Sequence, residues 1–153
     1  MTPAPILFYC QHLLGLGHAQ RAARLGMVDR HPAVAVELFR PDLAGHLAGA
    51  ALSVSQAGYN TVLDLLRSRV RAVVVPYEGT GDEQPIRAQL LAKRGLLRQL
   101  AAADLSPATL ALAMEAALTD PGFPAPGSVP LDGAARSTAA LAALAARVRA
   151  ARR

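Results

Sequence analysis

Short apolar runs alternate along this chain with segments of helical periodicity. The runs predict buried strands, and the last of them, which is β-branched, stops at Pro76; they lie at residues 6–9, 34–38, 52–54 and 72–75. Helices are predicted where apolar residues recur every three or four positions, at residues 18–25, 43–47, 60–67, 83–94, 107–118 and 134–151. Strands alternating with helices predict βαβ units, and therefore an α/β fold with a parallel sheet.

Polar and special residues mark where these elements begin and end. Asp42 is suited to cap the helix at 43–47, Gly95 to stop the helix at 83–94, and Ser106 followed by Pro107 to start the next helix. Residues 121–133 hold four prolines and three glycines and predict a linker. A helix rich in Ala and Arg follows, with a thin apolar stripe formed by Leu141, Leu144 and Val148.

Composition bounds the class of protein. A chain of 153 residues suits one domain, and 52% apolar residues are enough for a buried core, although only 4% are aromatic. Cys10 is the single cysteine, so no internal disulfide forms. The first residues lack the charged start of a signal peptide, and no apolar run reaches the roughly 20 residues that span a bilayer. We expect a soluble, cytoplasmic protein without a transmembrane segment.

The net charge of +5 is concentrated at one end. Residues 1–133 carry 11 basic and 11 acidic residues, and the excess comes from five arginines in the last 20 residues. A basic stripe on the folded domain is therefore not indicated, and we expect no nucleic-acid partner. A solvated helix end is the preferred interpretation of the basic tail, with contact to anionic lipid, at the membrane periphery, or to RNA as the alternative.

The stretch at residues 52–61, LSVSQAGYNT, carries the strongest chemical signal. A strand ends, small residues turn the chain, and a helix begins whose first N–H groups and dipole favour an anion such as a diphosphate. Gly58 allows close approach of a ligand to the backbone. A structural alternative stays open, in which Asn60 or Thr61 is an ordinary helix N-cap.

This stretch resembles the C-terminal domain of GT-B glycosyltransferases of the MurG-like group, glycosyltransferase family 28. The shared pattern is S-x-A-G-Y-N-T after a strand, then a strand ending in V-P, then E-Q and R-A. Here these are residues 55–61, Val75-Pro76, Glu83-Gln84 and Arg87-Ala88. The resemblance covers about residues 33–118 and implies a Rossmann-like parallel sheet flanked by helices, with a C-terminal helix.

The resemblance also implies roles for individual residues. The turn is expected to face the diphosphate of a nucleotide-sugar donor, most commonly a UDP-sugar. Asp64 is expected to hold the ribose, although Asp is shorter than the Glu of MurG-like enzymes. Glu83 and Gln84 are expected to contact the sugar, and Arg40 the base. A solvated helix residue is the alternative for Asp64, and a first-turn acid for Glu83. The donor-binding set is Ser55, Ala57, Gly58, Tyr59, Asn60, Thr61, Asp64, Glu83 and Gln84.

A second motif follows the first strand. Its glycines, Gly15 and Gly17, precede His18 and resemble the Gly-rich first loop of the N-terminal GT-B domain. His18 is the candidate catalytic residue, as a general base or by orienting the acceptor, because its ordinary pKa of about 6.5 suits proton transfer near neutrality. A helix-terminal histidine without a chemical role is an equal alternative.

The length is too small for two GT-B domains. We interpret residues 1–30 as a remnant of the N-terminal domain, whose strand at 6–9 joins the remaining sheet, and residues 31–120 as the nucleotide-sugar-binding domain. Residues 121–133 are the linker, and 134–153 the basic helix. Since the acceptor must be held near the anomeric carbon, we expect weak donor binding and little or no transfer. An uncovered apolar face favours self-association.

The leading hypothesis is therefore a hexosyltransferase-type donor module, inverting and metal-independent as the family implies, with no cofactor besides its donor substrate. No Asp-x-Asp occurs, in agreement with a metal-free site. A nucleotide-sugar 2-epimerase and a non-catalytic binding remnant are the alternatives. The turn at residues 57–60 favours the transferase over the epimerase, whose turn is usually of a Ser-Gly-Gly type.

Overall fold

The computed structural model describes residues 6–9, 42–79, 81–125 and 129–151. Its centre is a sheet with the strand order β1-β2-β3-β4, in which every neighbouring pair is parallel. The strands are β1 (Ile6–Tyr9), β2 (Leu52–Ser55), β3 (Ala72–Val74) and β4 (Arg98–Gln99). The predicted α/β class with a parallel sheet is confirmed, and residues 6–9 join the sheet beside β2 as expected.

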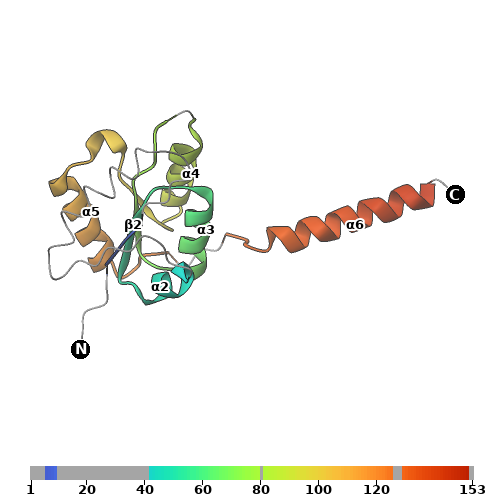
Figure 1. The fold of residues 1–153 in the computed structure, drawn as a ribbon, viewed down its shortest axis with the longest axis horizontal. Coiled ribbons are helices and arrows are strands. Elements are labelled where there is room, and N and C mark those ends of the chain that lie inside the picture. Colours follow the sequence, from blue (N-terminus) through green and yellow to red (C-terminus); the bar gives the residue numbers. More distant parts are fainter. Residues whose placement is uncertain (1–5, 10–41, 80, 126–128, 152–153) are drawn as a thin grey trace.

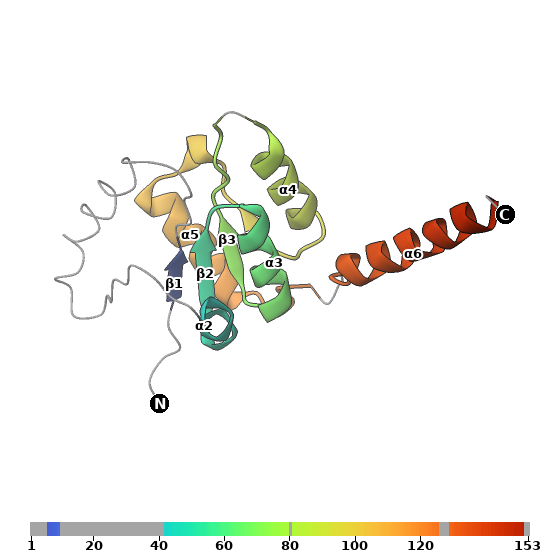
Figure 2. The same cartoon turned by 45° about the vertical axis from the view of Figure 1, so that its right-hand side comes forward.

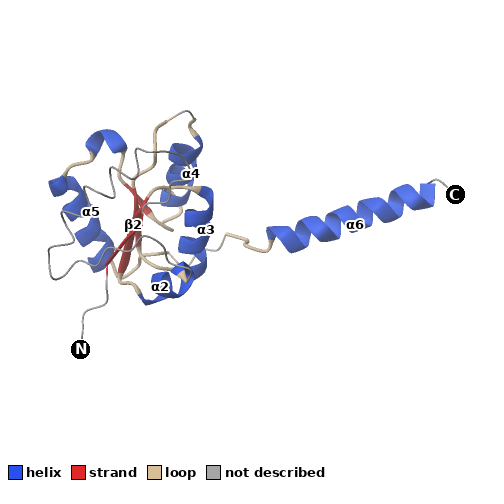
Figure 3. Ribbon diagram, viewed as in Figure 1, coloured by secondary structure: helices blue, strands red, loops and turns tan. Residues whose placement is uncertain are grey.

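Helices cover both faces of this sheet, as Figures 1 and 3 show. One face carries α2 (Leu43–Gly49), α3 (Tyr59–Ser68) and α4 (Glu83–Ala92), and the opposite face carries α5 (Pro107–Thr119). The predicted caps of two of these helices are confirmed. Asp42 accepts a hydrogen bond from the Gly45 N–H at 3.0 Å, and Ser106 forms a capping box with Thr109.

The strands distribute their side chains between two apolar clusters because successive residues of a strand point to opposite faces. Ala72 and Val74 pack with buried residues of α2, α3 and α4. Val73 points the other way and packs with Leu52 and Val54 of β2 and with Ala117 of α5. The sheet is therefore buried on both sides, which explains the continuous apolar run of β3. In β2, by contrast, buried serines alternate with Leu52 and Val54.

Several expectations need correction or lie outside the described residues. β4 and a short 3-10 helix, Ala102–Asp104, were not predicted, because two polar residues carry no strand pattern. The expected linker contributes to the core, since Phe123 is 6% exposed and packs with the α5 cluster. The strand predicted at 34–38, the helix at 18–25 and the Gly-rich motif before His18 fall outside the described residues.

The connection from α4 into β4 depends on a glycine. Gly95 has φ +67, in the left-handed region, and a Cβ added there would meet the Ala125 Cβ at 3.1 Å. The Ala125 N–H donates to the Gly95 carbonyl oxygen at 2.8 Å. This contact holds the segment after α5 against the end of α4, and so closes that edge of the domain.

The final helix, α6 (Gly133–Ala151), projects away from the sheet and the other helices in both views (Figure 2). None of its residues is buried. Its apolar stripe is open, with exposed fractions of 66% for Leu141, 55% for Leu144 and 46% for Val148. The domain core is thus complete without this helix.

Candidate functional site

The turn between β2 and α3 is short and ends in an uncapped helix. The chain leaves β2 at Ser55, and α3 begins at Tyr59 with Gly58 as its N-cap, at φ −60 and ψ 150. No side chain makes a capping hydrogen bond. The alternative in which Asn60 or Thr61 is the N-cap is therefore wrong, because both residues lie inside the first turn of the helix.

A glycine N-cap leaves the first helical N–H groups without a side-chain acceptor. Within the described part of the chain, no hydrogen bond is made by the backbone N–H groups of Tyr59 and Asn60, and both residues are exposed, Tyr59 at 65%. The positive end of the α3 dipole adds to these donors. The tip of α3 is consequently open and chemically suited to an anion.

The backbone does not require glycine at position 58. A φ of −60 is available to every residue, and a Cβ added there would meet only the Thr61 Oγ1, at 3.6 Å, an ordinary contact. The absence of a side chain at position 58 therefore relieves no clash within the protein, and instead leaves free space beside the tip of α3. This is the arrangement expected where a ligand approaches the backbone closely.

The start of α4 is tied directly to this turn. The Gln84 Oε1 accepts hydrogen bonds from the Ala57 N–H at 3.1 Å and from the Tyr77 N–H at 3.0 Å. The Arg87 guanidinium donates to the Ala57 carbonyl oxygen at 2.8 Å and lies 5.7 Å from the centre of the Tyr59 ring. Two residues of α4 thus fix the turn and bring a positive charge beside it.

Arg87 was quoted in the sequence motif but received no functional role there. Arg87 and Ala57 are far apart in the sequence, so no local pattern predicts their contact. Helical periodicity indicates the face of α4 on which a residue lies, but not the loop that this face contacts. The one available signal is its spacing: Arg87 lies four residues after Glu83, on the same face of the helix. The structure shows these two side chains 3.9 Å apart.

The remaining predicted residues differ in exposure. Ser55 is buried at the end of β2, and its Oγ has no hydrogen-bond partner among the described residues. Thr61 is buried in the first turn of α3. Asp64, half-buried, lies 3.8 Å from Arg67, and Glu83 has an 88% exposed side chain at the start of α4. Asp64 and Glu83 thus retain carboxylate oxygens for a ligand.

Other predicted residues cannot be placed. His18, Gly15, Gly17 and Arg40 lie outside the described residues. Within the ranges that the structure describes, no three His, Cys, Asp or Glu side chains gather as a metal site. No helix in those ranges is long and apolar enough to cross a membrane.

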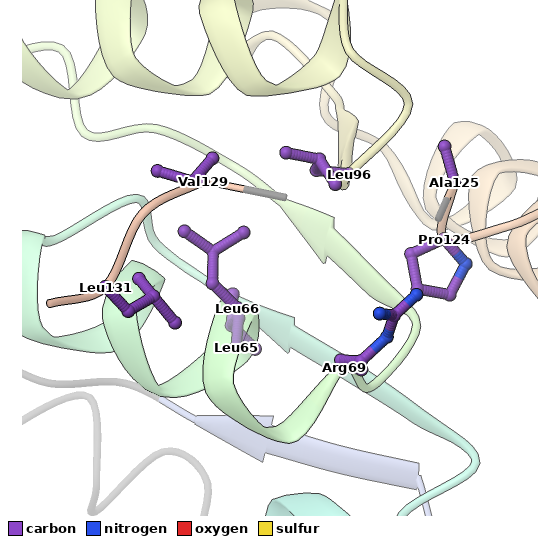
Figure 4. A pocket seen from close by; sticks show the side chains of 8 residues that line it. All are labelled: Leu65, Leu66, Arg69, Leu96, Pro124, Ala125, Val129 and Leu131. Atoms are coloured by element: carbon purple, nitrogen blue, oxygen red, sulfur yellow. The ribbon is translucent and has the colours of Figure 1, made fainter. Parts of the chain in front are cut away.

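Two hollows lie near α3 and α4. The first, about 180 Å³, is lined by the C-terminal half of α3 and by the segment after α5, and so lies at the other end of α3 from the turn (Figure 4); its residues are Leu65, Leu66, Arg69, Leu96, Pro124, Ala125, Val129 and Leu131. The second follows α4 and includes Glu83 and Arg87, together with Asp82, Ile86 and Leu90. Only the second adjoins the residues that fix the turn.

Comparison with known proteins identifies the class to which this fold and turn belong. The family model of the glycosyltransferase family 28 C-terminal domain matches residues 9–130, and the chain belongs to that family. The match begins ahead of the region at 33–118 in which the sequence pattern was recognised. The assignment of residues 1–30 to a remnant of another domain stays a prediction.

Two bacterial relatives make the relationship more specific. Both are UDP-N-acetylglucosamine--N-acetylmuramyl-(pentapeptide) pyrophosphoryl-undecaprenol N-acetylglucosamine transferases. The protein of Gloeobacter violaceus is 33% identical over 111 residues, which are 72% of this chain and 30% of the relative. That of Syntrophotalea carbinolica is 36% identical over 81 residues, or 52% of this chain and 23% of the relative. The chain therefore spans less than a third of the length of either enzyme.

Solved structures share the fold. MurG of Acinetobacter baumannii superposes with a TM-score of 0.62 at 24% identity, over 77% of this chain and 45% of that chain. The glycotransferase of kitacinnamycin gives a TM-score of 0.61 at 21% identity, over 80% and 36% of the two chains. These similarities establish a Rossmann-like α/β fold that this chain shares with part of each of these proteins, and they confirm the resemblance on which that prediction depended.

Proposed function

We propose that this domain binds the diphosphate of a nucleotide-sugar donor at the open tip of α3. The observation that carries the proposal is the glycine N-cap, which leaves the N–H groups of Tyr59 and Asn60 available to an anion. The Arg87 guanidinium, 2.8 Å from the Ala57 carbonyl oxygen, adds a full positive charge beside the same turn. Membership of a glycosyltransferase family supports a donor as that anion.

Two carboxylates supply the acceptors that a nucleotide sugar needs on either side of its phosphates. Asp64 lies four residues after Asn60, on the same face of α3, and is our candidate for the ribose hydroxyls. Glu83, 88% exposed, begins α4 and is our candidate for the sugar hydroxyls. Carboxylate oxygens accept hydrogen bonds from hydroxyl groups, which supports both assignments; the choice of ribose for Asp64 and sugar for Glu83 is what the family resemblance implies.

The reaction proposed for the family's complete enzymes is inverting, metal-independent transfer of a hexosyl group. The relatives named above transfer N-acetylglucosamine, and we propose a UDP-sugar as the donor here. Transfer also requires an acceptor held near the anomeric carbon. Because the chain spans 30% of the length of its relative from Gloeobacter violaceus, we propose donor binding with little transfer by this chain alone.

Ligand-observed NMR with UDP, GDP and dTDP tests the site directly. Wild type should give saturation-transfer signals, strongest for UDP, and Gly58→Trp should lose them because the indole covers the helix tip. Thermal unfolding of the variant is the folding control; it should match wild type, since a Cβ at position 58 meets only the Thr61 Oγ1. Equal nucleotide binding by wild type and a folded Gly58→Trp would refute the proposal.

Incubation with a radiolabelled UDP-sugar then separates the kinds of activity. Retention of the donor without turnover is the result we expect. Release of an isomerised sugar nucleotide would favour the epimerase alternative, and efficient transfer to an added acceptor would contradict the expected loss of activity.

A further inference from the structure

We infer that Gln84 is a positioning residue whose side-chain oxygen sets the shape of the diphosphate turn. This inference rests on the proposed function, because it concerns how the same turn is held ready for its ligand. It adds to the sugar contact that the family resemblance implies for this residue, since the two N–H donors of the Gln84 amide are not used in holding the turn. Gln84 and Arg87 together form a brace between α4 and the turn.

The first argument is the use of the Gln84 carbonyl oxygen. Its Oε1 accepts the Ala57 N–H at 3.1 Å and the Tyr77 N–H at 3.0 Å. An amide oxygen has two lone pairs, so both are occupied. Ala57 follows β2 and Tyr77 follows β3, and one side-chain oxygen therefore joins the two loops that leave the carboxyl ends of adjacent strands.

The second argument is the environment of Ala57. This residue is fully buried, and Gln84 takes its N–H while Arg87 donates to its carbonyl oxygen at 2.8 Å. Both polar groups of Ala57 are thus held by α4. A buried N–H that lost its acceptor would have no water to replace it, so the turn depends on the Gln84 oxygen.

The third argument is the difference in exposure between Glu83 and Gln84 at the start of α4. Glu83 is 88% exposed, and its closest described partner is Arg87, at 3.9 Å. Gln84 is half-buried and turned toward the protein backbone. Neighbouring residues on a helix point in different directions, so the Glu83 carboxylate is available to a ligand while the Gln84 oxygen serves the turn.

These roles predict different binding signatures. A positioning residue presents the helix tip to the diphosphate, so its loss weakens the binding of UDP, which carries no donor sugar. A residue that contacts only the sugar contributes to UDP-N-acetylglucosamine alone, so its loss leaves the affinity for UDP unchanged. The affinity for UDP therefore reports the positioning role, and the ratio of the two dissociation constants reports a sugar contact.

Calorimetric titration of both compounds into the full chain makes this test. Gln84→Met keeps the length of the side chain and removes the acceptor; we expect the affinity for UDP, and with it that for UDP-N-acetylglucosamine, to fall by about tenfold or more. Glu83→Ala is the matched control at the neighbouring position and should weaken only UDP-N-acetylglucosamine. A loss confined to the sugar nucleotide in Gln84→Met would overturn the inference and leave the proposed function standing.

Amide hydrogen exchange tests the brace without any ligand. In Gln84→Met the N–H groups of Ala57 and Tyr77 should exchange about tenfold faster. The Ser53 N–H, which donates to the Arg71 carbonyl oxygen at 2.8 Å, is the internal reference and should not change. Gln84→Glu retains an acceptor and should keep both amides protected.

The calorimetric titration and the hydrogen-exchange experiment distinguish failure of the proposed function from failure of the inference about Gln84. If wild type binds neither compound, the proposed function fails, and the exchange rates still decide whether Gln84 holds the turn. Unchanged protection of Ala57 and Tyr77 in a folded Gln84→Met would refute the brace by itself.

Discussion

A single residue determines the backbone structure at each end of α3. At its start, Gly58 provides no capping side chain, and the first N–H groups stay exposed. At its end, Arg69 adopts φ 55 and ψ 25, and its N–H donates to the Leu65 carbonyl oxygen at 2.9 Å. The left-handed conformation at a helix end is one that glycine adopts without steric cost and arginine does not.

We therefore predict that Arg69→Gly stabilises the domain by about 0.5–1 kcal/mol, because the strained conformation is relieved and little packing is lost at an exposed position. Urea unfolding should show a higher midpoint with an unchanged slope. Arg67→Gly, two residues earlier in regular helix, is the matched control and should cost about 1 kcal/mol. Destabilisation by both substitutions would contradict this account of Arg69.

At this scale the sequence predicted the turn but not what holds it. The strand, small residues and helix at 52–61 are local signals, and they lie where the pattern indicated. The bonds from Gln84 and Arg87 to Ala57 join positions 27 and 30 residues apart. Such contacts are fixed by how α4 packs, and no local periodicity encodes that packing.

Among the elements, the segment after α5 differs most between the sequence prediction and the structure. It was predicted as a linker from its prolines and glycines, yet Phe123 is buried against Leu52, Val54 and Val73 of the sheet. The Arg98 guanidinium lies 5.2 Å from the Phe123 ring and 2.8 Å from Asp120. This aromatic side chain closes the α5 face of the sheet.

Phe123→Ala should therefore destabilise the domain by about 3 kcal/mol, since it empties a buried aromatic site. Pro121→Ala, in the same segment and exposed, is the control and should change stability by less than about 0.5 kcal/mol. Chemical unfolding followed by circular dichroism measures both. If Phe123→Ala were as mild as the control, the segment would be a linker as first predicted.

The sequence predicted long elements well and short or remote ones poorly. α3, α4 and α5 were placed to within two residues at either end, because each runs over ten or more residues and, in α5, because Ser106 caps the start as predicted. β4 was missed because Arg98 and Gln99 enter the sheet only through pairing with β3. The docking of Phe123 was missed because proline and glycine content predicts a turn in the backbone but not where a neighbouring aromatic side chain is buried.

At the scale of the whole molecule, the described chain has a domain with a buried core and a helix, α6, outside that core. The sheet and its covering helices enclose both apolar clusters, and α6 contributes no residue to either. α6 carries Arg136, Arg147 and Arg149, no acidic residue and a stripe of exposed leucine and valine. A helix of 19 residues without a buried residue depends on its own backbone hydrogen bonds and its alanine content, and not on burial of an apolar face.

We therefore predict that a chain ending at Asp132 keeps the free energy of unfolding of the full chain to within about 0.5 kcal/mol. Its nucleotide signals in saturation-transfer NMR should also be unchanged, because the turn and the brace lie entirely within residues 55–87. Far-ultraviolet circular dichroism should lose the helical signal of α6. A stability loss at every protein concentration would show that α6 packs on its own domain. A loss that grows with concentration of the full chain would instead identify its stripe as a contact between copies, since association stabilises a fold by mass action.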